Sequence, residues 1–527
     1  MQEFRAFTFA FALDRTLRCD GTRDYDRTVV RDRALALLTA AILAAAAAAA
    51  APLSAQDAPE ARPDATDDIA RVERVLRPAI DIAGRATGSY TIEERMRHYD
   101  VPGVSIAVVD EGRIAWARGY GVADAATERP VTPATRFQAA SISKPVAALA
   151  ALRLVDDGEL DLDEDVNRRL TSWRVPENEL TEHAPVTLRG LLTHSAGLTV
   201  HGFGGYAVGE PVPDVVDILD GRAPANSDPV RVDLEPGAEW RYSGGGYTVM
   251  QLLLTDVTGR PFPDLVDSLV LEPLGMREST YEQPPPDTLE GSASTAHGTD
   301  GLAIDGRYHT YPEMAAAGLW TTPSDLARYV LGVQAALDGI ADAILSRDLA
   351  RAMVTREIGT SGLGPAVAGR ADSLRFQHGG SNRGFKAFVL GYADRGRGVA
   401  IMTNGERGSA LAQEVLFAVA EVYGWPGIGP RRIEPLALDA AALDAYVGRY
   451  DLEDGPQPSS LRIARDGDRL TVELGPASSG ELIPVAPDRF LLLPGGQSVE
   501  AERDADGRVV AMRGGGGRWL RARRPTR

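Results

Sequence analysis

Ser141 and Lys144 form a pair whose residue types and spacing could do nucleophilic chemistry. Residues three apart lie on the same face of a helix, so the Lys144 amine can reach the Ser141 hydroxyl. A neutral amine can accept the hydroxyl proton, and unpaired N–H groups at a helix N-terminus stabilise the developing negative charge. Arginine keeps its proton in proteins, and of the 56 Lys+Arg only Lys144 and Lys386 are lysine. We therefore predict Ser141 as nucleophile and Lys144 as general base; the alternative is an N-cap serine followed by a surface lysine.

Two further segments carry groups that could complete such a site. Tyr242 lies in the glycine-rich segment 240–247 that leads into an expected helix, and a phenol beside a lysine can pass a proton to a leaving group. The segment His378–Ser381 is expected to end one strand and start a turn, where its glycines let a substrate approach and the Ser381 N–H could donate to an oxyanion. The plainer alternatives are a packed turn tyrosine and a Gly-Gly hairpin turn with an exposed histidine.

Together these residues resemble the serine β-lactamase and penicillin-binding protein superfamily, and within it the branch of class C β-lactamases, D-Ala carboxypeptidases and esterases. Phe137–Pro145 looks like the family's nucleophile segment, Leu188–Leu198 is similar to its downstream "LLTHTSGL" stretch, and Glu272–Met276 matches another recurrent segment. The resemblance covers roughly residues 92–423, with the segments in the family's order. It implies an antiparallel sheet with a helical domain, and a reaction through an acylated serine.

Carried over residue by residue, the resemblance makes Ser141 the acylated nucleophile, Lys144 its base and Tyr242 the first residue of the family's Y-x-N motif. His378 takes the first position of the K-T-G motif, and the amides of Ser141 and Ser381 would form the oxyanion hole. The predicted substrate-binding and oxyanion residues are His378, Gly379, Gly380 and Ser381.

Two departures from the family pattern lower the expectation of β-lactam hydrolysis. Gly244 stands where the Y-x-N motif has asparagine, so a side-chain amide that would contact the substrate is missing. His378 replaces a lysine whose fixed charge attracts a substrate carboxylate, and a histidine that is neutral at pH 7 does so poorly. The sequence therefore favours ester, amide or D-amino-acid peptide substrates, with weak or no β-lactamase activity. Lys386 matches no motif and is expected to be an ordinary exposed strand lysine.

The order of strands and helices that must position these residues predicts an α+β body around one antiparallel sheet. A hairpin is expected over 104–109 and 113–122, and a helix over 141–157. The later elements expected in the body are strands over 375–377, 385–392 and 399–404 and a helix over 410–423.

Short strands separated by Gly, Asp and Pro turns follow the body and predict a small all-β, lipocalin-like barrel of fewer than 100 residues. The expected strands are 461–465, 469–473, 481–485, 489–493, 498–503 and 509–513. The resemblance also implies such a barrel, because small domains of this kind are often appended to these hydrolases.

An alanine-dominated apolar run near the start is followed by a small-residue break, which is typical of a secretory signal peptide over about 29–55. The alternative is a membrane anchor. We expect an exported protein, periplasmic or secreted, without a stable membrane anchor after cleavage. The predicted organisation is an upstream segment and signal peptide 1–55, a linker 56–68, a β-lactamase-related serine hydrolase domain 69–424, a linker 425–432 and a small antiparallel β domain 433–527.

Composition excludes several other functions. With 74 Asp+Glu against 56 Lys+Arg the formal net charge is −18, and the sequence has no basic run for nucleic acid. The single cysteine, Cys19, rules out a cysteine-ligated metal site, and the seven histidines form neither H-x-H nor H-E-x-x-H, so no metal and no cofactor is expected. His194 and His201 are expected to be loop or structural residues.

The expected partner is a small-molecule or short-peptide substrate, with cell-wall fragments among the candidates. The alternative function is a non-catalytic penicillin-binding or cell-envelope regulatory protein on the same scaffold. The presence of Ser141, Lys144 and Tyr242 together counts against that alternative, because a pseudoenzyme need not keep all three.

Overall fold

The computed structural model describes residues 65–86, 88–289, 291–394, 396–453, 459–474, 479–493, 495–514 and 517–522. The predicted signal peptide, and the predicted linker as far as residue 64, lie outside the described residues. Helix α2 (Ala65–Val72) includes the last four residues of that predicted linker. Ala65, Ile69 and Val72 recur at helical spacing and are buried, and this burial outweighs the polar composition around them.

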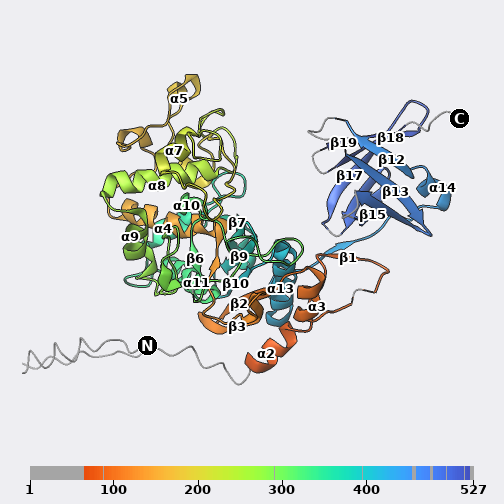
Figure 1. The fold of residues 1–527 in the computed structure, drawn as a ribbon, viewed down its shortest axis with the longest axis horizontal. Coiled ribbons are helices and arrows are strands. Elements are labelled where there is room, and N and C mark those ends of the chain that lie inside the picture. Colours follow the sequence, from red (N-terminus) through yellow and green to blue (C-terminus); the bar gives the residue numbers. More distant parts are fainter. Residues whose placement is uncertain are drawn as a thin grey trace, which may run out of the picture. The chain divides into compact units, whose positions relative to one another are not determined.

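Seven described strands form one antiparallel sheet in the order β4-β3-β2-β10-β9-β8-β7 (Figure 1). The predicted hairpin is confirmed as β2 and β3, and the strands predicted over 385–392 and 399–404 are confirmed as β9 and β10 within two residues. The strand predicted over 375–377 is β8, which is five residues longer at its C-terminal end. The bounds are β2 Gly103–Asp110, β3 Arg113–Asp124, β4 Arg129–Pro130, β7 Ala366–Ala368, β8 Arg375–Asn382, β9 Phe385–Tyr392 and β10 Gly398–Thr403.

Helices cover both faces of this sheet because successive strand residues point to opposite sides. Ile401 of β10 packs in a cluster with α2, with α3 (Ile92–His98) and with α13 (Gly408–Tyr423), whereas Met402 belongs to the cluster that contains α11 (Pro323–Asp338). Helix α13 confirms the helix predicted over 410–423 and begins two residues earlier.

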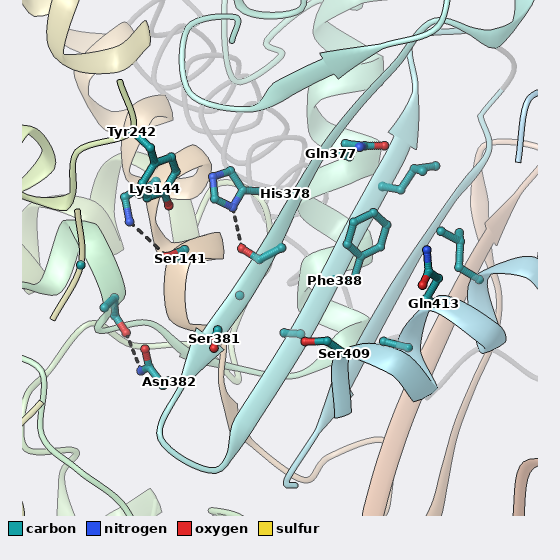
Figure 2. A pocket seen from close by; sticks show the side chains of 18 of the residues that line it. Ser141, Lys144, Tyr242, Gln377, His378, Ser381, Asn382, Phe388, Ser409 and Gln413 are labelled. Carbon is teal, nitrogen blue, oxygen red and sulfur yellow. Dashed lines mark hydrogen bonds between the residues drawn. The ribbon is translucent and has the colours of Figure 1, made fainter. Parts of the chain in front are cut away.

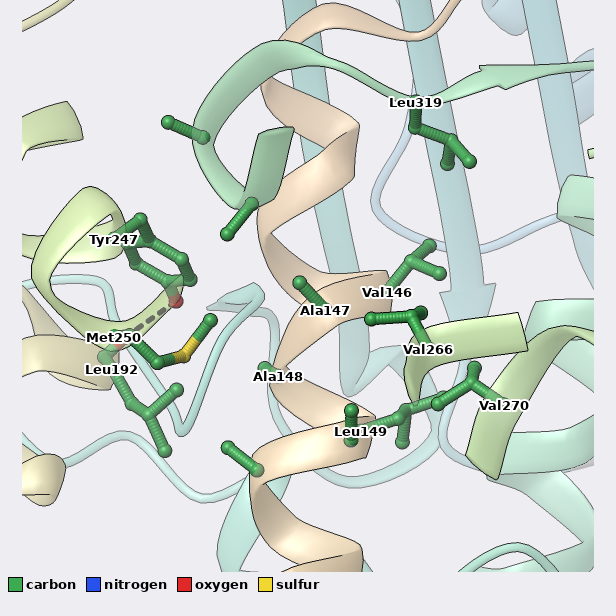
Figure 3. Close-up of a cluster of buried hydrophobic side chains, with 14 of the residues drawn as sticks. Val146, Ala147, Ala148, Leu149, Leu192, Tyr247, Met250, Val266, Val270 and Leu319 are labelled. Atoms are coloured by element: carbon green, nitrogen blue, oxygen red, sulfur yellow. Dashed lines mark hydrogen bonds between the residues drawn. The ribbon is translucent and has the colours of Figure 1, made fainter. Parts of the chain in front are cut away.

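Helix α4 (Ser143–Asp156) runs through the second of these clusters and is apolar on nearly all sides, which is typical of a buried helix. Figure 3 shows Val146, Ala147 and Leu149 of α4 between side chains of several other segments. One of these is α8 (Gly244–Thr258), whose Tyr247 hydroxyl donates to the Leu192 carbonyl over 3.0 Å. The remaining helices and short strands of the body are α5 Glu179–His183, α6 Leu188–Thr193, α7 Val215–Asp220, α9 Phe262–Val266, α10 Met314–Ala317, α12 Arg347–Met353, β5 Phe137–Gln138 and β6 Trp320–Thr321. Among the described helices, none combines the length and the apolar character that a membrane crossing requires.

Eight described strands close into the barrel that the sequence predicts (Figure 1). The prediction did not include the first and last strands of the barrel, β12 and β19, which pair with each other and close the barrel. Tyr450 and Phe490 belong to the barrel's own core. The strands are β12 Gly448–Leu452, β13 Ser460–Asp466, β14 Arg469–Leu474, β15 Ser479–Ala486, β16 Arg489–Leu493, β17 Gln497–Arg503, β18 Val509–Gly514 and β19 Gly517–Arg521. Short elements outside the barrel pairing are β1 Ile80–Ile82, β11 Arg431–Ile433 and α14 Ala440–Asp444.

Candidate active site

Ser141 lies on a single 3₁₀ turn, Ala140–Ile142, that leads directly into α4. The Lys144 Nζ atom is 3.2 Å from the Ser141 Oγ atom, which is the contact that the i, i+3 spacing predicts. A second hydrogen bond, 2.8 Å long, joins Nζ to the Ala316 carbonyl oxygen at the end of α10. Ala140 has φ of +52°, a conformation that is costly for a residue with a Cβ and that occurs often beside active-site residues. The serine is therefore held in a strained turn beside a tethered amine.

Lys144 is a buried residue, with 2% of its surface exposed. Its Nζ atom lies over two aromatic rings, 4.9 Å from the ring centre of Tyr242 and 5.7 Å from that of Tyr247. Among the described residues, no carboxylate forms an ion pair with it. Its polar partners are the nucleophile candidate and one carbonyl oxygen, so the amine is aimed at the serine and not at a counter-ion.

Two histidine rings contact the ring of Tyr242, which lies beside Lys144 (Figure 2). The ring centre of His194 lies 4.2 Å from that of Tyr242, and the ring centre of His201 lies 4.9 Å away on a glycine-rich loop. Both histidines were predicted to be loop or structural residues, and their contact with the Tyr242 ring is a detail that the prediction did not include. The position of His194 inside the family-like stretch Leu188–Leu198 is the sequence feature that could have identified it.

His194 is buried and uncharged. Burial, together with the nearby charge of Lys144, lowers the pKa of the His194 imidazole well below its usual value. Its Nδ1 accepts the Ser243 N–H over 3.1 Å, so the proton resides on Nε2, which has no hydrogen-bond partner among the described groups. This residue therefore supplies a fixed, neutral stacking surface for Tyr242.

Gly244 has a packing reason to lack a side chain. A Cβ atom there would lie 3.0 Å from the Phe203 ring and 3.1 Å from the His201 carbonyl oxygen. The loop that carries His201 therefore packs closely against the start of α8, where the family pattern has asparagine. A longer side chain at 244 would push this loop away from Tyr242.

The segment His378–Ser381 does not end a strand, as the sequence analysis expected, but lies inside β8; the following turn centres on Arg383 and Gly384. Gly380 is explained by close approach and not by a turn. A Cβ atom at Gly380 would lie 2.1 Å from the Ala139 carbonyl oxygen, so glycine lets the strand pass directly against the nucleophile turn. At Gly379 a Cβ atom would meet nothing within 4 Å, because this position faces open space.

His378 is neutral at pH 7. Burial, with a smaller contribution from the charge of Lys144, lowers the pKa of the His378 imidazole to about 4. Its Nδ1 lies 2.7 Å from the Gly379 carbonyl oxygen, which can only accept, so Nδ1 carries the proton and Nε2 is an acceptor. Where the family has a cationic lysine, this site therefore offers an uncharged ring.

Lys386 is buried, so the prediction of an exposed strand lysine is wrong. It lies on the face of β9 that α13 covers, and sequence periodicity alone did not identify that cover. Its Nζ atom donates to Glu406 over 2.7 Å and to the Asn382 carbonyl oxygen over 3.0 Å. Glu406 also accepts the Gly384 N–H over 2.7 Å. Burial alone would raise the pKa of the Glu406 carboxyl, but these hydrogen bonds and the lysine charge hold it below its usual value. The Lys386–Glu406 ion pair therefore holds the turn that follows Ser381 in place.

A cavity of about 840 Å³ brings the predicted residues together (Figure 2). Its lining includes every predicted site residue: Ser141, Lys144, Tyr242, His378, Gly379, Gly380 and Ser381. It continues past them to Phe388 of β9 and to Ser409 and Gln413 of α13, which the sequence analysis did not identify. Within the described residues, no cluster of three or more His, Cys, Asp or Glu side chains is arranged to hold a metal ion. The arrangement can activate a serine hydroxyl toward a carbonyl carbon by proton transfer to an amine.

Comparison with known proteins identifies the same family that the sequence motifs resemble. A family model described as Beta-lactamase matches residues 90–423. Penicillin-binding protein 4* of Bacillus subtilis (strain 168) is 23% identical over 432 residues, which cover 74% of this chain and 87% of that protein. Esterase EstB of Burkholderia gladioli is 32% identical over 225 residues, which cover 40% of this chain and 56% of that protein.

Solved structures agree on the fold. The octameric penicillin-binding protein homologue from Pyrococcus abyssi superposes with a TM-score of 0.52 at 22% identity, covering 82% of this chain and 98% of that one. The family model spans the nucleophile turn, the tyrosine loop and β8, and so confirms the resemblance that the sequence indicated. The chain belongs to the β-lactamase family and is a serine hydrolase of that type.

Proposed function

We propose that the protein is an exported hydrolase that forms an acyl-enzyme on Ser141 with Lys144 as general base. The observation that carries this proposal is the 3.2 Å contact between Nζ and Oγ in a cavity that also contains Tyr242 and the His378–Ser381 segment. A serine with an adjacent base and nearby amide donors is the arrangement that acyl transfer requires.

The proposed reaction has two halves. Lys144 takes the Ser141 proton as Oγ attacks the substrate carbonyl carbon, and the amides of Ser141 and Ser381 stabilise the oxyanion. The bond to the leaving group then breaks, and Tyr242 passes that group the proton it needs. Water next attacks the acyl-enzyme, the acid is released and the Ser141 hydroxyl is restored.

For substrates we propose uncharged esters, amides or D-amino-acid peptides, with weak or no hydrolysis of β-lactams. The neutral ring of His378 supports this proposal, because it lacks the fixed positive charge that would attract a carboxylate. Gly244 supports it too, because no side-chain amide is available there. The name of one relative, Esterase EstB, is consistent with ester hydrolysis.

Export and the source of the substrate belong to the same proposal. The alanine-rich run before residue 56 supports cleavage of a signal peptide, and a small molecule or short cell-wall peptide would then be met outside the cytoplasm. N-terminal sequencing of protein recovered from the cell exterior or periplasm should start near residue 56. Recovery of the uncleaved chain from the cytoplasm alone would contradict export.

Acylation tests the catalytic proposal. A fluorophosphonate probe or a labelled penicillin should add one adduct to Ser141, located by mass spectrometry of peptides, and Ser141→Ala should take none. A folded protein that reacts with neither probe would refute the proposal. Slow acylation with no turnover of p-nitrophenyl esters or D-Ala-D-Ala peptides would instead favour the non-catalytic regulatory alternative.

A further inference from the structure

The loop between α6 and α7 carries an aromatic residue, Phe203, beside the nucleophile, and we propose that its ring binds an aryl group of the substrate. The inference rests on the proposed function, since it names a substrate class for the same site. It commits to an uncharged ester or amide that carries a phenyl-like ring. Phe203 is then a residue that determines specificity, while the chemistry stays with Ser141 and Lys144.

Phe203 lies on the same side of the sheet as the nucleophile. It packs against the hydrophobic cluster that contains α4, the helix that carries Lys144. Phe388 and Phe417 instead pack against the cluster that contains α13, on the other side of the sheet. No strand of the sheet therefore stands between Phe203 and the catalytic residues.

Direct contacts join the nucleophile to this loop. The Lys144 Nζ atom lies 3.2 Å from the Ser141 Oγ atom and 4.9 Å from the ring centre of Tyr242 (Figure 2). The ring centre of Tyr242 lies in turn 4.9 Å from that of His201. All four residues line the cavity, as does Phe203, two positions beyond His201. A substrate that is bound at Ser141 and extends past the phenol therefore meets this loop next.

Hydrogen bonds hold the loop on each side of Phe203. On one side, the Gly244 N–H donates to the His201 carbonyl oxygen over 3.1 Å. On the other side, the Gly204 carbonyl oxygen accepts the Tyr311 hydroxyl over 3.3 Å. The Tyr311 oxygen also accepts the N–H of the first residue after β8, over 3.1 Å. The loop thus reaches from the start of α8 to the end of β8, and its fixed backbone lowers the entropy that is lost when a ligand binds to the ring.

Gly244 leaves free the space that the Phe203 ring occupies. A Cβ atom at 244 would lie 3.0 Å from Cε2 of Phe203, so the ring lies where a side chain of residue 244 would begin. The family pattern has an asparagine amide at this position, and this chain offers an apolar ring in its place. Phe203 is partly exposed and lines the cavity. Its apolar surface gains when a ligand displaces water, and a pair of aromatic rings gains more than the buried area alone accounts for.

Four esters related to ethyl acetate measure the preference and show on which side of the scissile bond the ring lies. Ethyl phenylpropanoate and ethyl cyclohexylpropanoate carry a terminal ring on the acyl side, and phenylethyl acetate and cyclohexylethyl acetate carry it on the alcohol side. Two methylenes separate each ring from the ester group, so the two members of a pair have similar intrinsic reactivity. In one pair we expect kcat/KM for the phenyl ester to exceed that for ethyl acetate about tenfold or more, and that for the cyclohexyl ester about threefold or more. Hydrophobicity alone would not favour phenyl, because a cyclohexyl ring buries at least as much apolar area.

Phe203→Leu tests whether this ring causes the preference, because it removes the aromatic ring and keeps an apolar side chain. The phenyl-to-cyclohexyl ratio of kcat/KM in the responding pair should fall to about one. Phe417→Leu makes the same substitution at a partly exposed ring of α13, on the other side of the sheet, and this matched control should leave the ratio at its wild-type value.

Three results would overturn the inference while ethyl acetate is still hydrolysed. They are phenyl esters that are no better than cyclohexyl esters in both pairs, a ratio that Phe203→Leu does not lower, and a ratio that Phe417→Leu lowers as far. Absence of hydrolysis of ethyl acetate and of all four esters would instead refute the proposed function, and the inference with it.

Discussion

Glu313 is a buried carboxyl whose titration should lower stability as the pH rises from about 4.5 to 8. It precedes α10, the helix whose Ala316 carbonyl oxygen binds Lys144, and it is 0% exposed. Neither of its carboxyl oxygens has a hydrogen-bond partner among the described groups. Burial raises the pKa of Glu313 from 4.5 to about 8, so the folded protein keeps it protonated at pH 7.

The sign and size of the effect follow from the two pKa values. Between pH 4.5 and 8 the unfolded chain loses this proton while the folded protein retains it, so the free energy of unfolding falls as the pH rises. Each unit is worth about 1.4 kcal/mol, and allowing for partial titration at each end, the loss from pH 5 to pH 8 is about 3–4 kcal/mol. Glu313→Gln has nothing to titrate and should lack this loss.

Urea unfolding of the wild type and of Glu313→Gln at pH 5, 6, 7 and 8 measures the difference directly. The amide has its own pH-independent burial cost, so the quantity to compare is the change in stability between pH 5 and pH 8, not the stability at one pH. The variant should gain about 3–4 kcal/mol relative to the wild type over this range. Parallel curves would show that Glu313 titrates normally in the folded protein, and would refute the reasoning.

Substitutions at three further positions test other parts of the site. Tyr242→Phe keeps the ring that contacts His194 and His201 but removes the hydroxyl. Steady-state kinetics on a p-nitrophenyl ester should therefore show kcat lowered about 100-fold with KM changed much less; a loss mainly in KM would contradict a role in proton transfer. His378→Lys adds a fixed positive charge to the site. The ratio of kcat/KM for a carboxylate-bearing substrate such as nitrocefin to kcat/KM for a neutral ester should therefore rise about tenfold. An unchanged ratio would show that charge at position 378 does not set specificity. Lys386→Met leaves Glu406 without its ion pair, so the free energy of unfolding in urea should fall by about 1–3 kcal/mol and kcat should fall about tenfold. Lys386→Arg restores the charge and should recover most of kcat. Equal kcat in the methionine variant and the wild type would exclude a positioning role for Lys386.

The site could be predicted where the chemistry depends on local spacing. Ser141 and Lys144 are three residues apart, so a single turn brings them together whatever surrounds it. The β2–β3 hairpin and α13 follow equally from local alternation and helical periodicity. The barrel was predicted from six of its strands, but β12 and β19 were missed because their short sequences acquire strand character by closing it.

Other features depend on contacts that sequence separation hides. Gly379 and Gly380 were predicted to be turn residues. The close approach of Gly380 to Ala139 joins segments more than 200 residues apart, so the local sequence does not reveal it. Lys386 is buried because α13 covers its face of β9, and Glu406, from the loop between β10 and α13, neutralises it. His194 gains its role from stacking on Tyr242. In each case tertiary packing, and not local preference, decides the environment of the side chain.

Lys144→Arg separates a general base from a fixed cation, because arginine keeps a positive charge at position 144 and cannot accept the Ser141 proton. The rate of Ser141 acylation by a fluorophosphonate is measured by mass spectrometry, with circular dichroism and a urea curve to show that the variant is folded. If Lys144 is the general base, the folded variant should be acylated at a rate at least about 1000-fold below that of the wild type. Acylation of the folded arginine variant at a rate near that of the wild type would contradict Lys144 as the general base.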